Sequence, residues 1–544
     1  MDRRQVLGGG AALLGAAFGS GLFQRRADAS SSRPADPDRL ADLLVDGSDP
    51  LIRAAVSDYL RDGVARHYAL RNYAAFWFGA DSPQGHADAL LAGLAHADTD
   101  ALDPRDYDPS RLPNWDASPE HRELAYSFSA ARYGIDIQSG RADPKRAEPD
   151  LFVYPRDTQP DSVLLKLGLA KDPRAALAAM APQSDRYRNL RAAYTAWRVK
   201  ASEDPPPTVP DGPALKPGME DPRLSAIADR LIYLGIPIDG AVGSTYDPGL
   251  QAAVAAFQAR YGLAADGVVG KQTLATLNRD AAEWVTTAAL NMERLRWLPD
   301  NFGSRHVHVN IADFQLDYWE DGAPKLGMAV VVGRPYRRTP VFSDRIRYID
   351  FSPTWTVPPG ILVKDMIPKI KKDPTVIEKF GYRFFTGGAN PKEIDPSQID
   401  WATVEARGFP YQIQQRPGDD NALGRVKFMF PNTHNVYLHD SPAKELYARP
   451  ERAFSSGCIR VSKPELLAQA LLRDQPDWTA ERIADAMTRD KPVRVLMKET
   501  VPVHLTYLTA WVPSGADMSD PLHAVRFRPD VYDRDGILRA ALGA

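Results

Sequence analysis

A proline-rich stretch divides this 544-residue chain into two parts of different character. Six prolines stand between Pro205 and Pro217. Because proline lacks an N–H group and has a fixed φ, such a stretch cannot continue a helix and is typical of a stiff linker. We therefore place a linker at residues 201–217 and expect separate domains on either side of it. The length of the chain allows about three or four domains.

The part of the chain before the linker, residues 37–200, is rich in Ala, Leu and Arg. Its apolar residues recur at helical spacing, as in the run from Glu123 to Tyr133. Apolar side chains that return every three or four residues predict amphipathic helices. We expect a helical domain here, without a group of catalytic residues.

Residues 218–279 contain two turns of the form Asp-Gly-x-x-Gly, at Asp239 and Asp266, and each precedes a helical stretch. Such turns use residues that tolerate a positive φ. With the helix predicted from Leu250 to Tyr261, this pattern resembles the small three-helix peptidoglycan-binding domain. The resemblance implies that the glycan is a partner. A helical spacer that keeps the fold without the binding is the alternative.

The remainder of the chain is predicted to be mostly β after a helix that ends near Leu295. Segments of alternating or continuously apolar residues predict strands at 305–311, 327–333 and 424–430. The polar, Lys-rich segment 361–420 differs from these strands and is predicted to be an inserted lid over a cleft. We assign this domain to residues 280–500.

The first 29 residues have the order of an export signal. Basic residues come first, an apolar run follows to Phe23, and small residues precede a cleavage site at Ala29. The pair Arg3-Arg4 resembles a twin-arginine signal, so we expect export to the periplasm by that route. An uncleaved membrane anchor is the alternative, and contact with a membrane is expected only in that case.

The single cysteine, Cys458, is the strongest candidate for a functional residue. Exported proteins normally use cysteines in disulfide pairs, so a lone one is either a bystander or a nucleophile. Gly457 beside it allows a tight turn, in which the thiol and backbone N–H groups could face one carbonyl. His439, nineteen residues upstream, is a candidate base.

These two residues lie in segments that resemble the catalytic signature of the YkuD-type L,D-transpeptidases. The segments are Asn435 to Pro442, which contains the histidine, and Arg452 to Val461, which contains Ser-Ser-Gly-Cys. The order of domains resembles the large YcbB-like branch of that family, including its carboxyl end, which here is an extension over residues 501–544. The resemblance implies a multidomain α+β protein with a helical scaffold domain, a peptidoglycan-binding domain and a catalytic domain with an inserted lid.

The resemblance also implies the roles of the site residues. Cys458 is the nucleophile, and His439 is the base that withdraws its proton. The backbone carbonyl of Asp440 holds the second ring nitrogen, so the Asp440 side chain need not act. The N–H groups of Gly457 and Cys458 are the expected donors to the oxyanion.

Four further residues are predicted to bind substrate, each with an alternative. Tyr437 shares a strand face with His439, and Tyr437 and Trp355 line the cleft or else belong to the core. Arg460 binds a substrate carboxylate or is a structural ion-pair partner. Ser456 occupies a position where many smaller relatives have histidine, which leaves its role open.

Three further histidines lie outside the signature. His306 and His308 share one strand face and could bind zinc, but an ordinary strand is favoured because no third ligand is evident. His434 is separated from His439 by an odd number of positions, so we expect it in a loop or on the surface. No metal or organic cofactor is expected.

The resemblance implies a two-step acyl transfer. Peptidoglycan stem peptides are joined by 3→3 cross-links between diaminopimelate residues, D-Ala is released, and carbapenems acylate Cys458. Three alternatives are a carboxypeptidase or hydrolase on the same site, an enzyme that anchors proteins to the wall, and a non-catalytic scaffold. With a net charge of −3, the chain has no large basic surface that would suggest nucleic acid as a partner.

Overall fold

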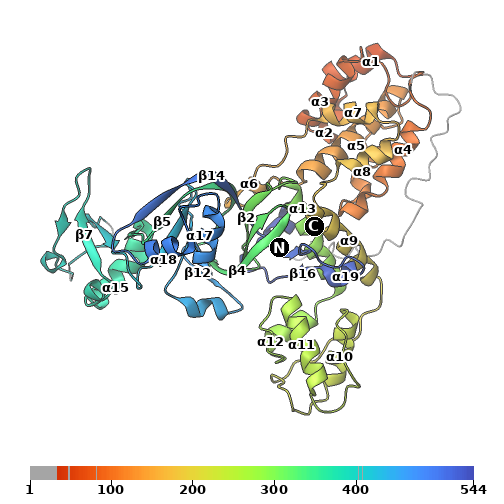
Figure 1. Cartoon of the computed structure of the whole chain (residues 1–544). Coiled ribbons are helices and arrows are strands. Elements are labelled where there is room, and N and C mark those ends of the chain that lie inside the picture. Colours follow the sequence, from red (N-terminus) through yellow and green to blue (C-terminus); the bar gives the residue numbers. More distant parts are fainter. Residues whose placement is uncertain (1–33, 47–48, 81, 402, 407, 544) are drawn as a thin grey trace, which may run out of the picture.

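The computed structural model describes residues 34–46, 49–80, 82–401, 403–406 and 408–543. The expected export signal lies outside the described residues. The α+β multidomain organisation is confirmed: a helical lobe, a small three-helix lobe and a β-rich lobe meet at one junction (Figure 1). In the described part of the chain, no helix combines the length and the apolar character needed to cross a membrane.

The helical lobe is built around one long central helix, α5. Its start is set by Ser118, whose side chain accepts the His121 N–H, and by Pro119 in the first turn. The α-helices of this lobe are α1 (Pro37–Ala41), α2 (Pro50–Ala55), α3 (Asp58–Ala69), α4 (His86–Leu94), α5 (Pro119–Ser139), α6 (Pro144–Ala147), α7 (Pro160–Leu169), α8 (Pro173–Met180) and α9 (Asp185–Lys200).

The three-helix lobe follows the prolines. It consists of α10 (Leu224–Tyr233), α11 (Pro248–Arg260) and α12 (Lys271–Leu277). The Asp247 side chain accepts the Leu250 N–H at 2.8 Å and so caps α11. Both predicted Asp-Gly turns contain a glycine with positive φ, at Gly240 and Gly267. Helix α13 (Ala281–Arg296) then packs against α9 and leads into the β-rich lobe.

The β-rich lobe contains a sheet that closes on itself. The order among the described strands is β1-β5-β10-β11-β13-β4-β3-β2-β14, and β14 pairs with β5 as well as with β2. The strands are β1 (Leu151–Phe152), β2 (Arg305–Asn310), β3 (Gln315–Glu320), β4 (Ala323–Gly333), β5 (Val341–Phe351), β10 (Val426–Met429), β11 (Leu438–His439), β12 (Ala453–Ser455), β13 (Ile459–Val461) and β14 (Val493–Thr506).

One strand of this sheet, β1, comes from the helical lobe. Leu151 and Phe152 pair in parallel with Val341 and Phe342 of β5. The sequence analysis did not predict this strand, because two residues between helices carry no periodic pattern. Through it, the helical lobe contributes a strand directly to the sheet of the β-rich lobe.

The inserted segment forms a separate lobe, which contains β7 and α15 and lies at the left of Figure 1. Its elements are β6 (Trp355–Thr356), α14 (Pro359–Ile361), α15 (Ile367–Lys372), α16 (Val376–Lys379), β7 (Tyr382–Thr386), β8 (Glu393–Ile394) and β9 (Tyr411–Gln415). Phe384 and Ile413 are fully buried in its own apolar core. The lobe begins before the predicted residue 361, because Trp355 pairs with Gln415 of β9.

The carboxyl end does not separate from the catalytic domain at residue 501 as predicted. Strand β14 runs through that point without a break and pairs with β5 on both sides of a bulge. The elements around it are α17 (Pro464–Leu472), α18 (Ala480–Met487), β15 (Ala510–Trp511), α19 (Pro521–Ala524), β16 (Arg526–Phe527) and α20 (Arg534–Ala541). The residues after β14 therefore follow directly from a strand of the sheet, without a domain boundary at residue 501.

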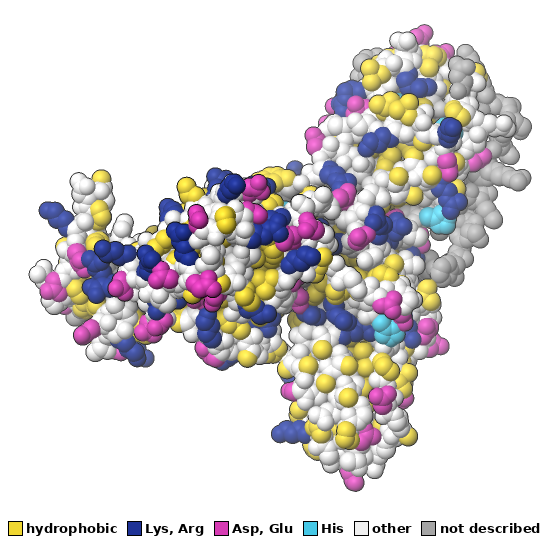
Figure 2. Space-filling model, in the orientation of Figure 1, with side chains coloured by type: hydrophobic (Ala, Val, Ile, Leu, Met, Phe, Trp, Pro, Cys, Tyr) yellow, Lys and Arg dark blue, Asp and Glu magenta, His cyan; other side chains and the backbone are white. Residues whose placement is uncertain are grey.

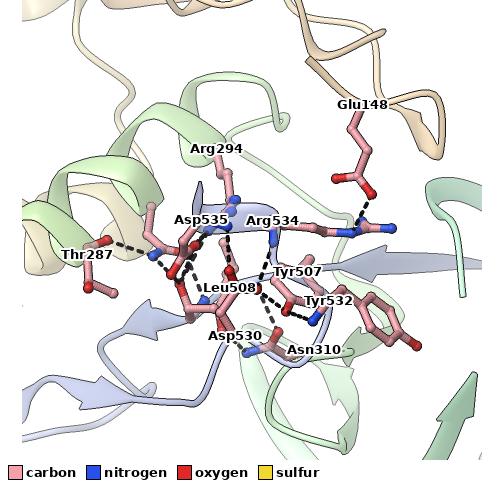
Figure 3. A network of polar contacts seen from close by, with 12 residues as sticks. Glu148, Thr287, Arg294, Asn310, Tyr507, Leu508, Asp530, Tyr532, Arg534 and Asp535 are labelled. Carbon is pink, nitrogen blue, oxygen red and sulfur yellow. Dashed lines mark hydrogen bonds and ion pairs between the residues drawn. The ribbon is translucent and has the colours of Figure 1, made fainter. Parts of the chain in front are cut away.

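A polar network ties the carboxyl end to the other lobes (Figure 3). Asp535 pairs with Arg294 of α13 at 2.5 Å and accepts from Thr509. Arg534 pairs with Glu148 of the helical lobe at 3.0 Å. Arg294, Arg534 and Glu148 are almost completely buried, so each needs its partner to offset the loss of water. On the face in Figure 2, acidic and basic side chains are interspersed over all lobes.

Candidate active site

The site is organised by the register of three neighbouring strands. His439 of β11 lies opposite Lys427 of antiparallel β10 and opposite Arg460 of parallel β13. Residues that face each other across a pair of strands point to the same side of the sheet. The three side chains therefore share one face.

Tyr437 and Cys458 join this face because they stand two residues before His439 and Arg460, respectively. The tyrosine ring lies 5.6 Å from the His439 ring, centroid to centroid. The alternate residues, Leu438 and Ile459, point into the core and are completely buried. Alternation thus places five polar side chains on one side and apolar ones on the other.

The turn that carries the cysteine is held by a serine that the sequence analysis missed. Ser455 Oγ donates to the Cys458 carbonyl at 2.6 Å and accepts the Gly457 N–H at 3.1 Å. Gly457 has φ of +115°, a conformation that side-chain-bearing residues rarely adopt. The predicted role of Gly457 as an oxyanion donor needs correction, because its N–H is already engaged.

The backbone N–H of Cys458 differs in its hydrogen bonding from that of Gly457. In the part of the chain that the structure describes, it makes no hydrogen bond. It is therefore the backbone donor that remains available beside the thiol.

The thiol of Cys458 is half-buried and unoxidised. Its Sγ donates to the Asn435 carbonyl oxygen at 3.5 Å. Within the described residues, no hydrogen bond joins the thiol to the His439 ring. Catalytic hydrogen bonds are often long before substrate binds, so this arrangement is compatible with a base that engages during the reaction.

The electrostatic surroundings of the thiol act in opposite directions. Burial raises the pKa of Cys458 above its usual range, while the N–H and hydroxyl of Tyr437 lower it. The positive charges of Lys427 and Arg460 also lower the pKa of the thiol. Burial has the largest effect, so the resting group is a neutral thiol.

The imidazole of His439 is neutral as well. Burial and the charges of Arg460 and Lys427 lower its pKa to about 3, although carbonyl groups of Asp440 and Leu423 favour the protonated ring. Its Nδ1 lies 2.5 Å from the Asp440 carbonyl oxygen. Because a carbonyl only accepts, the contact with Asp440 puts the hydrogen of the neutral ring on Nδ1 and the lone pair on Nε2.

The Asp440 side chain points elsewhere. One carboxylate oxygen accepts the Arg425 N–H at 2.9 Å, and the other pairs with Lys444. The carboxylate thus has structural partners of its own, and only the backbone carbonyl of Asp440 contacts the imidazole.

Lys427 is a site residue that the sequence analysis did not find. Its ammonium group lies 3.9 Å from the centroid of the Tyr437 ring, and burial lowers its pKa. No motif singles it out, since it lies on a different strand of ordinary composition. The pattern of β10 alone, with buried Val426 and Phe428 on either side of Lys427, could have placed it on the face opposite the core.

Arg460 has an unusual environment for an arginine. Its Nε is buried without a hydrogen-bond partner, and no ion pair to it occurs among the described residues. Burial lowers its pKa, as expected when a cation lacks a close anion. This finding disfavours the alternative of a structural ion-pair partner.

Ser456 joins the catalytic turn to the inserted lobe. The Arg337 guanidinium donates to Ser456 Oγ at 2.8 Å and pairs with Asp365 of the insertion at 2.5 Å. The other predicted cleft residue, Trp355, packs instead against the core of the insertion. Among the residues that the structure describes, no ring contact or hydrogen bond joins Trp355 to Cys458 or His439.

The three histidines that the sequence analysis considered outside the signature make structural contacts. His306 Nδ1 donates to the Gly303 carbonyl at 2.8 Å, and His308 Nε2 lies 2.9 Å from Thr506 Oγ1. The His434 ring lies against Phe152 of β1, with ring centroids 3.9 Å apart and the ring planes tilted by 35°, and is half-buried. No group of three or more possible metal ligands occurs among the residues that the structure describes.

Three protein families match successive parts of the chain. Residues 62–193 match a family described as "Scaffold domain". Residues 220–277 match the family "Putative peptidoglycan binding domain". Residues 304–495, which include Cys458 and His439, match the "L,D-transpeptidase catalytic domain" of the YkuD type.

A curated relative supports the same assignment. It is a Haemophilus influenzae protein named "Putative L,D-transpeptidase", 36% identical over 247 residues, which are 45% of this chain and 47% of the relative. This chain therefore aligns with about half of the relative's length.

Solved structures that resemble the chain do so weakly. An L,D-transpeptidase from Xylanimonas cellulosilytica has 17% identity and a TM-score of 0.18, covering 54% of this chain and 98% of its own. One from Stackebrandtia nassauensis has 14% identity and a TM-score of 0.21, covering 55% and 96%. The structure titled "Ldtfm-avibactam carbamoyl enzyme" has 15% identity and a TM-score of 0.18, covering 38% and 50%.

The family matches coincide with the three lobes and with the segments that carry the site. Residues 304–495 are thus a YkuD L,D-transpeptidase catalytic domain, in a chain that also contains a scaffold domain and a peptidoglycan-binding domain.

Proposed function

We propose that this protein forms 3→3 cross-links in peptidoglycan through an acyl-enzyme on Cys458. The observation that carries the proposal is the shared strand face of Cys458, His439, Tyr437, Lys427 and Arg460. In this proposal Cys458 is the nucleophile, His439 is the base, and Lys427 and Arg460 are the two neighbouring cations. That combination suits attack on a carbonyl group of a negatively charged peptide.

In the first step, Sγ of Cys458 attacks the carbonyl carbon of the L-centre of diaminopimelate at position three of a tetrapeptide stem. The thiol proton passes to Nε2 of His439, whose Nδ1–H is held by the Asp440 carbonyl. The C–N bond to the terminal D-Ala then breaks. The departing amine takes the proton from His439, and a thioester remains.

In the second step, the side-chain amine of a second stem's diaminopimelate attacks the thioester. A new amide bond forms, the C–S bond breaks, and His439 returns the proton lost by the amine to the sulfur. The negative oxygen of both tetrahedral intermediates is stabilised by the Cys458 N–H, which has no other partner among the described residues.

The two cations have different tasks in this proposal. Lys427 lowers the pKa of the thiol and so favours the thiolate during attack. Arg460 binds a carboxylate of the stem, which supplies the partner that its buried Nε lacks.

We also propose that the protein acts in the periplasm, reached through its twin-arginine signal, and that carbapenems acylate Cys458. The strained carbonyl of a carbapenem is open to the same thiolate attack as the stem peptide. The proposed partner of residues 220–277 is the glycan of the wall.

The experiment is mass spectrometry of products from purified disaccharide-tetrapeptide, with Cys458→Ala as the control. A dimer that lacks one D-Ala and is absent from the control is the expected result. Tripeptide without dimer assigns the protein as a carboxypeptidase. Products that do not depend on Cys458 would overturn the proposal and favour the non-catalytic scaffold.

A further inference from the structure

We propose that Thr339, on the loop between β4 and β5, is a positioning residue for the oxyanion donor of the acylation step. The proposal rests on the acyl-enzyme chemistry proposed above. Thr339 is completely buried, and its Oγ1 donates to the Gly457 carbonyl oxygen at 2.9 Å. The same Oγ1 accepts the Gly333 N–H at 2.9 Å. Thr339 thus contacts the catalytic turn from the interior of the domain.

The bond to the Gly457 carbonyl sets the direction of the Cys458 N–H. These two groups belong to one peptide unit, which is planar, and in the trans form they point in opposite directions. When Thr339 holds the carbonyl toward the interior, the N–H must point away from it. Rotation of this peptide by a few tens of degrees would carry the N–H away from the position of the oxyanion.

The catalytic turn itself offers little that could replace the Thr339 hydroxyl as a donor to the Gly457 carbonyl. Ser455 occupies the Gly457 N–H and also holds the Cys458 carbonyl, so both neighbouring peptide units are fixed by one hydroxyl. The peptide between Gly457 and Cys458 is the unit that Ser455 does not hold. Its orientation therefore depends on Thr339.

The backbone of Thr339 is itself held at both its N–H and its carbonyl. Its N–H donates to the Tyr532 hydroxyl at 3.3 Å, and that hydroxyl donates to the Gly333 carbonyl at 2.5 Å. Its carbonyl accepts from Arg534 at 3.4 Å, and Arg534 pairs with Glu148 of the helical lobe (Figure 3). The carboxyl end and the scaffold domain thus support the hydroxyl that orients the turn.

The loop before Thr339 is packed too tightly to shift. A Cβ atom on Gly333 would lie 2.1 Å from the Arg337 carbonyl oxygen and 2.8 Å from the Thr339 nitrogen. Only glycine fits at a backbone approach this close. The distance between Thr339 Oγ1 and the turn is therefore set by backbone packing rather than by a flexible side chain.

The test compares Thr339→Val with Thr339→Ser in the full protein. Valine keeps the shape of the side chain but loses the hydroxyl, whereas serine keeps the hydroxyl. One measurement is the rate at which tetrapeptide or a carbapenem acylates Cys458, followed by the mass of the adduct. The other is alkylation of Cys458 by iodoacetamide, a reaction in which no oxyanion forms.

We expect Thr339→Val to slow acylation by about 10- to 100-fold, somewhat less than the loss of a whole oxyanion donor. Its alkylation rate should stay within about twofold, and Thr339→Ser should recover most of the acylation rate. Thr506→Val, which removes a buried hydroxyl from β14 of the same sheet, is the matched control and should acylate normally.

Equal acylation by Thr339→Val and the wild type would overturn the inference. So would an equal fall in alkylation, because that result would mean that the thiol itself had moved. If the valine variant does not fold, Tyr532→Phe decides, since it loosens Thr339 and must slow acylation without slowing alkylation. Failure of the wild type to form any adduct would instead refute the proposed function.

Discussion

His439 donates from Nδ1 to the backbone carbonyl of Asp440, the residue that follows it, at 2.5 Å. The orienting group of the base is thus a main-chain atom rather than a carboxylate. A carbonyl holds the ring and fixes its tautomer without placing a negative charge beside it. Burial of the ring and the charges of Arg460 and Lys427 lower the pKa of His439 to about 3, although the Asp440 carbonyl by itself raises it.

Replacement of the Asp440 side chain is therefore expected to affect stability more than catalysis. Asp440→Asn should lower the free energy of unfolding by about 1–2 kcal/mol, because the ion pair with Lys444 is lost. The value of kcat/KM should change by less than about threefold. Chemical denaturation and steady-state kinetics measure the two effects. A loss of about 100-fold in kcat with the fold intact would mean that the carboxylate acts in catalysis.

Removal of the charge on Lys427 is expected to make the thiol harder to ionise. The ammonium group lowers the pKa of Cys458, so Lys427→Met should raise that pKa and slow alkylation at pH 7 by about three- to tenfold. The rates should converge at high pH, where both thiols are ionised. Lys498→Met, at an exposed lysine, is the matched control. Alkylation rates that follow the same pH profile in all three proteins, with no shift, would exclude this role of Lys427.

Two substitutions separate the charge of Arg460 from its shape. Arg460→Lys keeps the charge but loses the planar fork that binds a carboxylate through two hydrogen bonds. We expect it to raise KM for tetrapeptide by about tenfold and to leave the alkylation profile of Cys458 in place. Arg460→Met should raise KM and also shift the profile to higher pH. An unchanged KM in both variants would contradict the assignment of Arg460 to substrate binding.

The contact between the catalytic turn and the insertion predicts coupling between two residues. Arg337 bridges Ser456 and Asp365, so Arg337→Ala and Asp365→Ala each break the bridge. The double variant should be no worse in kcat/KM than the worse single one, with a coupling of about 0.5–1 kcal/mol for this partly exposed pair. Effects that simply add would mean that the two residues act independently.

The buried histidines are expected to make the protein sensitive to acid. Burial lowers the pKa values of His67, His306 and His504 to about 4 and that of His439 to about 3. Between about pH 6.5 and 4 the unfolded chain binds protons on these rings and the folded protein does not, so stability falls as pH falls.

Each such histidine contributes a slope of up to about 1.4 kcal/mol per pH unit in that window. His67→Leu removes one of them in the helical lobe, where the ring packs on Tyr68 and Phe76. Denaturation curves at several pH values should show a shallower dependence for this variant. An equal slope in both proteins would mean that His67 titrates normally in the folded state.

Local patterns in the sequence determined much of this protein. The prolines in residues 205–217 predicted a linker after the first helical region, and the spacing of apolar residues predicted the α+β class. The pair formed by His439 and the segment Ser455 to Cys458 predicted the nucleophile, its base and the family. The predictions of fold class and family succeed because helical periodicity, strand alternation and the chemistry of a turn each depend on residues close together in the chain. The catalytic roles of Cys458 and His439 stay predictions.

Contacts between distant segments were decided only by the tertiary structure. The pairing of β10 with β11 brings Lys427 to the site, and the fold of the carboxyl end brings Arg534 to Thr339. The engagement of the Gly457 N–H, which removed a predicted donor, depends on the rotamer of Ser455. Strand register and side-chain packing minimise the free energy of the whole domain, and no local pattern records which distant groups they bring together.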